Sequence, residues 1–301
     1  MSTFYFPCQF ITFQDNELDN YQIGRYGINR RKYNFSIFDS STLAVDHKLL
    51  NTPYQNMEIF FHNVGAELLV EDCESVDDAR QMIEVLRLAM LVAGSSCFFM
   101  PYITNTRMDL YCEINYRSSE NLRRYLSQES QEMPVPPEGS IEFSAYETYY
   151  HNFIFHGEHL IDKKFFEKSV AIAEKWSALE VNTQNLIMAR KATSIAPIIN
   201  DSSMCIMQIW QGIESFFTQN SELTFRLSLL IALLIGENRR EVFENVKSQY
   251  KIRSKVAHGD KIVVNNNELV EAWNLLISII KAVVVRGKLP TEDELMSEIF
   301  I

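Results

Sequence analysis

The residues best suited to chemistry lie late in the chain, in the segment YKIRSKVAHGD from Tyr250 to Asp260. Arg253 falls at the centre of an apolar helical face that includes Val246 and Tyr250. A guanidinium there requires a partner, because burying it unpaired costs several kcal/mol. His258 follows five residues later, and histidine side chains exchange protons near neutral pH. Together the two residues could bind a phosphate and transfer a proton.

The spacing of this pair bears on whether the two side chains can act together. On an ideal helix they point roughly 140° apart, so they converge only where the helix ends. The Gly259-Asp260 dipeptide is typical of such an end. The structural alternative is that Arg253 belongs to an ion pair and that His258 caps the last turn, where the helix dipole favours a cation.

A longer pattern surrounds the pair. The string RSKVAHG is preceded by WQGIESFFTQNSELTFRLSLLIALLIG, from Trp210 to Gly236. Over about Phe165 to Gly287 the chain resembles the Apea-like branch of the HEPN superfamily. The resemblance implies an all-α bundle in which Arg253 and His258 cleave RNA without a metal or other cofactor. It also implies a homodimer in which two copies of the motif line one cleft, acting in antiviral defence or as a toxin.

Several residues could support the pair. Glu214 and Arg226 interrupt apolar stripes, which predicts a buried Glu214–Arg226 pair that fixes helix register; the alternative is that Glu214 orients Arg253. Tyr250 and Lys255 could help to hold a substrate. Ser254 directly follows the arginine, where many HEPN motifs carry Asn, Asp or His, and is a further supporting candidate.

The charge distribution favours RNA as the ligand of the second half of the chain. The net charge is −11, and residues 1–159 carry 11 Lys+Arg against 22 Asp+Glu, whereas residues 160–301 carry 17 of each. Within the neutral half, Arg239 to Lys261 contains seven basic and three acidic residues. This local surplus has the sign that a phosphate backbone requires. The acidic first half is expected to bind a protein trigger or regulator instead of RNA.

Other site chemistries find little support in the sequence. There is no G-x-x-x-x-G-K-[ST] loop and no G-x-S-x-G elbow, which argues against P-loop nucleotide hydrolysis and Ser-triad chemistry. The five scattered cysteines include no C-x-x-C pair and are predicted to be reduced thiols. We predict no metal site, because the spacing of one polar cluster does not place its members on one face. That cluster comprises His151, His156, Glu158 and His159.

The apolar runs predict a cytoplasmic protein with no membrane segment. The longest run, Leu227 to Ile235, is well short of the ~20 residues that a membrane span needs. The first ten residues, MSTFYFPCQF, lack the basic residues of a secretion signal.

The first half, residues 1–156, is predicted to be an α+β sensor or regulatory domain. A capped, periodic helix is expected from Ser75 to Gly94, and a polar loop from Asn16 to Lys32. Aromatic and β-branched content predicts strands. These are expected within Phe4–Phe13, Tyr33–Phe38, Met57–Gly65, Ala66–Asp72, Ser96–Ile103, Arg107–Arg117 and Glu142–Phe155.

The second half, residues 157–301, is predicted to be an all-α bundle of HEPN type, because its apolar residues keep helical spacing throughout. Asn220-Ser221 is expected to cap the fourth of its helices. The expected helices are Phe165–Leu179, Ala192–Asn200, Ser203–Gln219, Glu222–Ile235, Arg239–His258 and Glu268–Arg286.

These patterns lead to one principal hypothesis, an endoribonuclease that uses the 2′-OH of RNA as its nucleophile. Two alternatives belong to other classes: a non-catalytic HEPN bundle that binds RNA or assembles with partners, and the neutralising partner of a toxin.

Overall fold

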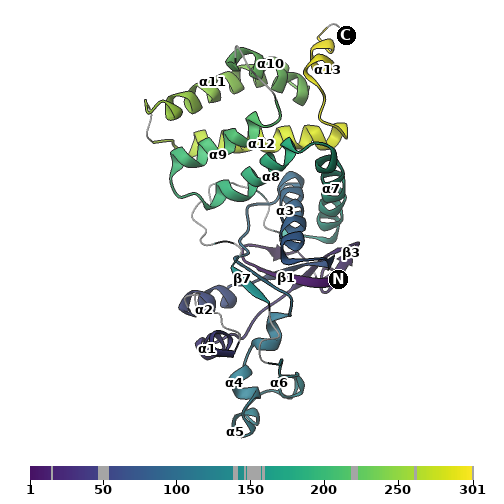
Figure 1. The fold of residues 1–301 in the computed structure, drawn as a ribbon, viewed down its shortest axis with the longest axis vertical. Coiled ribbons are helices and arrows are strands. Elements are labelled where there is room, and N and C mark those ends of the chain that lie inside the picture. The colour runs from purple at the N-terminus through teal and green to yellow at the C-terminus, as the bar shows by residue number, and fades with distance from the viewer. Residues whose placement is uncertain are drawn as a thin grey trace. The chain divides into compact units, whose positions relative to one another are not determined.

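In a computed structural model, the chain forms two compact units. We describe each unit by itself. The sheet unit comprises residues 1–83, 98–149 and 159–163, and the helical unit comprises residues 84–97, 150–158 and 164–301. The structure describes residues 1–14, 16–46, 54–137, 142–145, 147, 157, 160–217, 223–260 and 263–299. The expected boundary at His156 lies outside these residues. The expected order, an α+β part followed by a mostly helical part, is confirmed (Figure 1).

The sheet unit is built on six strands in the order β3-β4-β5-β1-β6-β7, each antiparallel to its neighbours. The parallel pair of β2 and β8 forms a separate small sheet. The strands are β1 (Ser2–Cys8), β2 (Thr12–Phe13), β3 (Tyr21–Ile23), β4 (Tyr26–Arg30), β5 (Ala66–Cys73), β6 (Tyr102–Thr104), β7 (Phe143–Ala145) and β8 (Leu160–Ile161).

Helices and turns of the sheet unit replace several expected strands. Residues 33–38 lead instead into α1, and the expected strands at 57–65 and 107–117 are helical. The expected loop at 16–32 contains the β3–β4 hairpin, and the strand expected to run beyond Ala145 lies largely outside the described residues. The helices are α1 (Ile37–Asp46), α2 (Tyr54–His62), the 3-10 helix η1 (Met108–Tyr111), α4 (Ile114–Arg117), α5 (Glu120–Arg123) and α6 (Gln128–Glu132).

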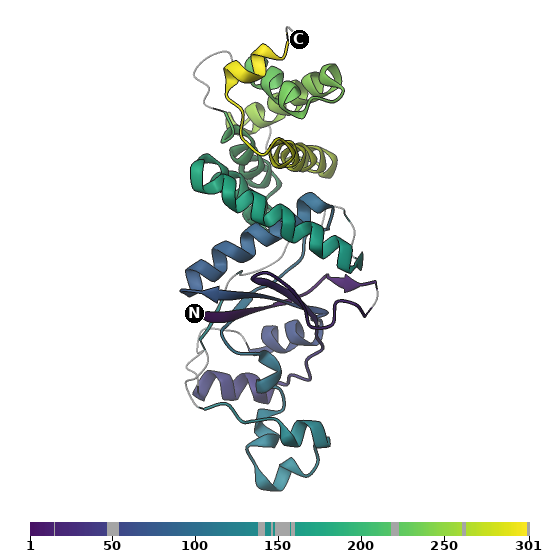
Figure 2. The ribbon, with the colours of Figure 1, turned by 90° about the vertical axis from the view of Figure 1, so that its right-hand side faces the viewer.

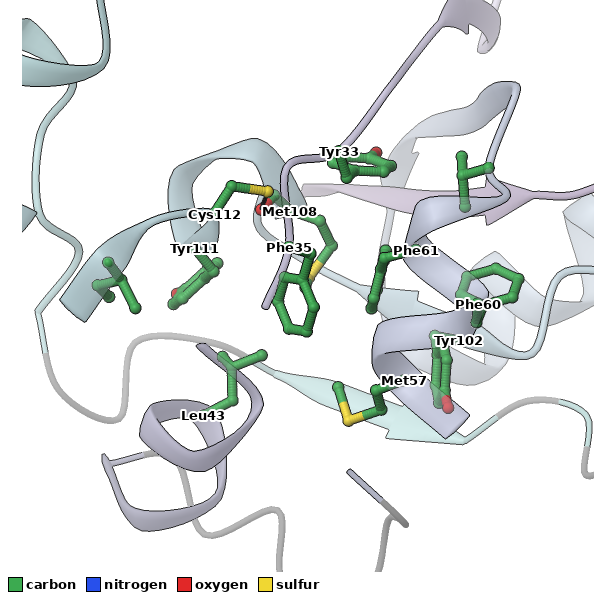
Figure 3. Close-up of a cluster of buried hydrophobic side chains, with 12 residues drawn as sticks. Tyr33, Phe35, Leu43, Met57, Phe60, Phe61, Tyr102, Met108, Tyr111 and Cys112 are labelled. Atoms are coloured by element: carbon green, nitrogen blue, oxygen red, sulfur yellow. Dashed lines mark hydrogen bonds between the residues drawn. The ribbon is translucent and has the colours of Figure 1, made fainter. Parts of the chain in front are cut away.

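An aromatic cluster explains why α1 and α2 pack as helices. Phe61 on α2 lies with its ring centroid 4.6 Å from Phe35 and 5.8 Å from Tyr102 of β6, stacked on the latter (Figure 3). Leu43 of α1 and Met57 of α2 belong to the same buried cluster. The aromatic side chains that favoured strands therefore fill the core that α1 and α2 form with β6 and η1.

A buried carboxylate organises the adjacent strands. Glu67 on β5 is almost fully buried and accepts hydrogen bonds from the Tyr33 hydroxyl at 2.6 Å and from Arg31 Nε at 3.1 Å. Asn29 of β4 donates to it as well, at 3.4 Å. The pKa of Tyr33 is raised well above its ordinary 10.0. The main cause is burial of the hydroxyl, and the neighbouring Glu67 carboxylate is the second.

We expect Tyr33 to make the sheet unit sensitive to alkali. Because its pKa is raised on folding, its contribution to stability is complete below pH 10.0 and is lost as pH rises from there towards the higher folded pKa. The loss is about 1.4 kcal/mol per pH unit above 10.0. Urea unfolding followed by circular dichroism at about pH 8 and pH 11 should show a smaller loss in Tyr33→Phe than in the native chain. The exposed Tyr125→Phe is the control; equal losses in native chain and Tyr33→Phe would contradict the assignment.

The helical unit contains the second half of α3 (Val76–Ala93) together with the helices after residue 163. The side chain of Ser75 caps α3 as expected, accepting from the Asp78 amide at 3.1 Å. The later helices are α7 (Lys163–Asn182), α8 (Asn185–Ile195), the 3-10 helix η2 (Ala196–Ile198), α9 (Ser202–Glu214), α10 (Leu223–Ile235), α11 (Arg239–Ala257), α12 (Asn266–Arg286) and α13 (Glu292–Ser297). None of the described helices is long and apolar enough to span a bilayer.

Helix bounds follow local capping signals. The α8 helix begins seven residues before the predicted Ala192, and η2 follows it at Pro197, because a proline fits the first turn of a new helix and not the interior of an old one. The α9 helix ends at Glu214 instead of Gln219. The α10 helix ends before Gly236, as predicted, and its expected cap at Asn220-Ser221 lies outside the described residues.

A buried ionic network joins α3, α7 and α8 inside the helical unit. Arg190 on α8 donates to Glu84 of α3 and to Glu180 of α7, the latter from Nε at 2.8 Å. Trp176 Nε1 also donates to Glu180, at 2.6 Å. The side chains of Arg190 and Glu180 are only 4% and 5% exposed. In both views α7 lies beside the second half of α3 (Figure 1, Figure 2).

Candidate functional site

The α11 helix that carries the candidate residues ends where the sequence predicts. His258 is the last residue with helical backbone angles, and Gly259 follows in the left-handed region with φ 77°. The Gly259 amide donates to the Val256 carbonyl at 3.1 Å, and the Asp260 amide donates to Lys255 at 2.8 Å. This bond pair is the Schellman ending, which favours glycine because other residues are strained at positive φ.

Arg253 points from α11 towards α9, where it pairs with Glu214. Its Nη2 donates to Glu214 Oε2 at 3.0 Å, and its Nε lies 3.0 Å from Oε1 without the alignment of a hydrogen bond. The side chains of Arg253 and Glu214 are 25% and 32% exposed. The guanidinium is therefore held at one edge by a carboxylate while part of it is open to solvent.

Two aromatic side chains, Tyr250 and Trp210, pack next to the Arg253–Glu214 pair. The guanidinium carbon of Arg253 lies 5.7 Å from the ring centroid of Tyr250, within the range of a cation–π contact. Tyr250 in turn meets Trp210 of α9 edge to face at 5.4 Å. Burial, followed by the Glu214 carboxylate, raises the pKa of Tyr250. Ionisation of the Tyr250 hydroxyl beside the Arg253–Glu214 pair is therefore disfavoured.

The expected Glu214–Arg226 pair is wrong. Arg226 on α10 is half exposed and donates to Glu292 of α13 at 2.5 Å, while Glu214 contacts Arg253. The alternative reading of the sequence, in which Glu214 orients Arg253, matches the contacts. Glu214 ends α9 and Arg253 lies in the last turns of α11, so the two helices together place the pair.

One polar contact beside the site was missed from sequence. Gln249 is buried one turn before Arg253, and its Nε2 donates to Glu271 of α12. Its Oε1 is buried and finds no hydrogen-bond donor among the described residues. The signal available was the placement of Gln249 on the same apolar face as Arg253. No sequence pattern indicated that its partner would be Glu271 on α12.

His258 does not come together with Arg253 within the chain. Because α11 is continuously helical from Arg253 to Ala257, the rotation of roughly 140° between the two residues is kept. The His258 amide donates to the Ser254 carbonyl at 3.0 Å, and its side chain is exposed, as is that of Lys255. Ser254 is half-buried. The structure thus brings together Arg253, Glu214 and Tyr250, and leaves His258 and Lys255 on the solvent side.

A separate cavity of about 380 Å³ lies beside the first turns of α11 and does not include Arg253 or His258. Carboxylates and amides from α11, α12 and the loop before α11 line it, including Glu237, Asn238, Glu241 and Glu271. Within the part of the chain that is described, no group of three or more His, Cys, Asp or Glu side chains is placed to hold a metal ion. The His151, His156, Glu158 and His159 cluster and Lys261 lie outside that part.

Comparison with known proteins adds no further assignment. No family model, no curated protein and no solved structure matches the chain. The candidate site is therefore defined by its own residues. Arg253 pairs with Glu214 and contacts the ring of Tyr250, and His258 is the C-cap of the helix that carries Arg253.

Proposed function

We propose that the chain is a metal-independent endoribonuclease of HEPN type, with its site in the helical unit. The observation that carries the proposal is the fixed guanidinium of Arg253 five residues before the exposed His258. Arginine presents its donors as a planar fork that matches phosphate oxygens. Histidine supplies a base or an acid near neutral pH. These two functions suffice for cleavage of RNA, which carries its own nucleophile.

Glu214 occupies one edge of the Arg253 guanidinium, and a second edge can bind substrate. Glu214 contacts Nε and Nη2, and Nη1 makes no hydrogen bond or ion pair among the described residues. The Nη1 and remaining Nη2 hydrogens can donate to two oxygens of one phosphate. We assign Glu214 and Tyr250 as positioning residues, because they fix the plane of the guanidinium before substrate binds.

The reaction follows from the two roles. His258 accepts the proton of the 2′-OH as that oxygen forms a bond to the adjacent phosphorus. Arg253 stabilises the charge that develops on the non-bridging phosphate oxygens. The bond from phosphorus to the 5′ oxygen then breaks, and that oxygen takes up a proton. The products carry a 2′,3′-cyclic phosphate and a 5′-hydroxyl.

We further propose that the active form is a homodimer, because one chain does not bring His258 to Arg253. An isologous interface places the α11 end of one copy against that of the other without any additional element. Each site then combines the arginine of one protomer with the histidine of its partner. Ser254 and Lys255, which directly follow the arginine in the chain, would contact the same substrate.

Subunit mixing should reveal such shared sites. Arg253→Ala and His258→Ala chains are each expected to be inactive alone. After unfolding and refolding together, about a quarter of native activity should return, because half of the dimers are mixed and each holds one complete site. Light scattering should report a dimer. No recovery on mixing, with mixed dimers present, would place both residues of a site in one chain and contradict the arrangement.

The sheet unit would then act as sensor or regulator in an antiviral or toxin system of the cytoplasm. The acidic surplus of the first half of the chain disfavours RNA and suits a protein trigger of opposite charge. The substrate, whether tRNA, mRNA or phage RNA, would be selected by the helical unit.

The test is incubation of the purified chain with total cellular RNA in EDTA. Cleavage products with 2′,3′-cyclic phosphate ends are expected, detected by their resistance to ligation until the ends are opened and repaired. Strict dependence on Mg²⁺, or products with 3′-hydroxyl ends, would contradict the mechanism.

One contact favours a second candidate, a helical bundle that binds RNA without cleaving it. The Glu214 carboxylate already balances the charge of Arg253, as it would in a purely structural ion pair. RNA binding with intact substrate after long incubation would select this function.

A further inference from the structure

The solvent side of α11 carries a row of basic residues that ends at His258. At 100° per residue, its members fall within an arc of about 80° on the helix surface. Four of the five are exposed and Lys247 is half-buried. We name these residues the α11 track: Arg240, Lys247, Lys251, Lys255 and His258. Glu244 is the one carboxylate in the same arc.

An aromatic pair, one exposed ring and one half-buried ring, lies at the other end of the track. Phe225 of α10 is 57% exposed, and its ring centroid lies 5.5 Å from that of Phe243 on α11. The Lys247 ammonium lies 5.8 Å from the Phe243 centroid. A large apolar ring is costly to leave in water, whereas a ring beside cations is the usual platform for an unpaired base.

We propose that the α11 track and Phe225 form a binding surface for single-stranded RNA, which leads the strand to His258. The ligand class rests on the proposed ribonuclease function. Lys247, Lys251 and Lys255 follow one another at about 6 Å along the helix axis, close to the spacing of successive phosphates on an extended strand. A base stacks on Phe225, supported edge to face by Phe243. The track therefore takes a single strand, whose bases are free to stack, in preference to a duplex.

The experiment measures binding without cleavage. The probe is a fluorescent 2′-O-methyl oligouridine of about 20 nucleotides, which lacks the attacking hydroxyl, bound to the full chain in EDTA. The track variant is Lys247→Gln/Lys251→Gln/Lys255→Gln. The control is Lys175→Gln/Lys191→Gln/Lys281→Gln, which removes the same charge from exposed positions of α7, α8 and α12. Affinity is measured over a range of salt concentrations.

The track variant should bind about tenfold more weakly or worse than the native chain. Its plot of log affinity against log salt should be flatter by about 2, since each phosphate contact contributes about 0.7. The control should lose about twofold at most, because salt screens distant charges. Phe225→Ser should weaken binding about tenfold and leave the salt slope unchanged.

Equal losses in the track and control variants, or no binding by the native chain, would overturn the proposal. So would equal affinity for a matched duplex. If Phe225→Ser bound the probe with native affinity, Phe225 would not be part of the RNA-binding surface. The result is independent of cleavage: a chain that binds in this manner but leaves natural RNA intact refutes the ribonuclease and retains the track.

Discussion

Arg253→Ala and His258→Ala are each expected to lower the rate of RNA cleavage in EDTA by about a hundredfold or more. The loss of a positioned base or acid costs about 10²–10⁴ in rate. Removing one donor to a developing oxyanion costs about 10²–10³. Arg253→Lys should also be impaired, because an ammonium keeps the charge and loses the planar fork that Glu214 orients.

The controls separate chemistry from folding. Arg226→Ala removes a half-exposed arginine of α10 and should cleave at the native rate. Circular dichroism and thermal melting should show that Arg253→Lys and His258→Ala fold as the native chain does. Native rates in folded His258→Ala would refute the proposed proton transfer. Native rates in Arg253→Lys would show that the fork geometry is dispensable.

Arg190→Met is expected to destabilise the helical unit by about 3–5 kcal/mol. It leaves Glu180 buried beside Trp176 without its cation, and Glu84 loses the same partner. An uncompensated buried carboxylate must be dehydrated or protonated, and either costs free energy. The three tryptophans, Trp176, Trp210 and Trp273, all lie buried in this unit, so their fluorescence reports its urea unfolding.

Two matched variants test the cause. Lys288→Met breaks an exposed pair with Glu294, which solvent screens, and should leave the stability of the helical unit nearly unchanged. Arg190→Met/Glu180→Gln removes the orphaned charge and should recover part of the stability that Arg190→Met loses. If the double variant is no more stable than the single one, lost packing and not the buried charge explains the effect.

The sheet unit shows where local pattern reading failed. Met57, Phe60, Phe61 and Val64 repeat at intervals of three and four, the spacing of a helix face, yet their aromatic content favoured a strand. The core resolves the conflict, since Phe61 of α2 stacks on Tyr102 of β6. Strand propensity measures how well a side chain packs on a pleated surface. Here the pleated surface belongs to β6, and the aromatic side chains that pack on it come from the helix α2.

The β3–β4 hairpin was hidden by its polar surroundings. Ile23 pairs with Tyr26 across the two-residue turn Gly24-Arg25, and Gly24 has φ 57°. A glycine at the first position of such a turn is the signal of a type II′ hairpin. Polar residues around YQIGRYGI outweighed that signal in the sequence.

The helical unit was easier to predict because its signals are local. The α11 ending at Gly259 depends on neighbouring residues alone. The pairing of Glu214 with Arg253 spans 39 residues and depends on which helices are neighbours. Periodicity identifies the buried face of a helix and not the helix that covers it, so the sequence favoured Arg226 as the partner of Glu214, whereas the observed partner is Arg253.

The division of α3 between the two units also affects synthesis of the chain on the ribosome. Glu84 is made 106 residues before the arginine that it contacts, Arg190. At about 5–20 residues per second, about 5–20 s pass before α8 is complete. During that interval the second half of α3, with the buried side chains Leu86 and Met90, lacks the helices that complete the helical unit. The nascent chain therefore exposes apolar surface during synthesis that the finished protein has buried.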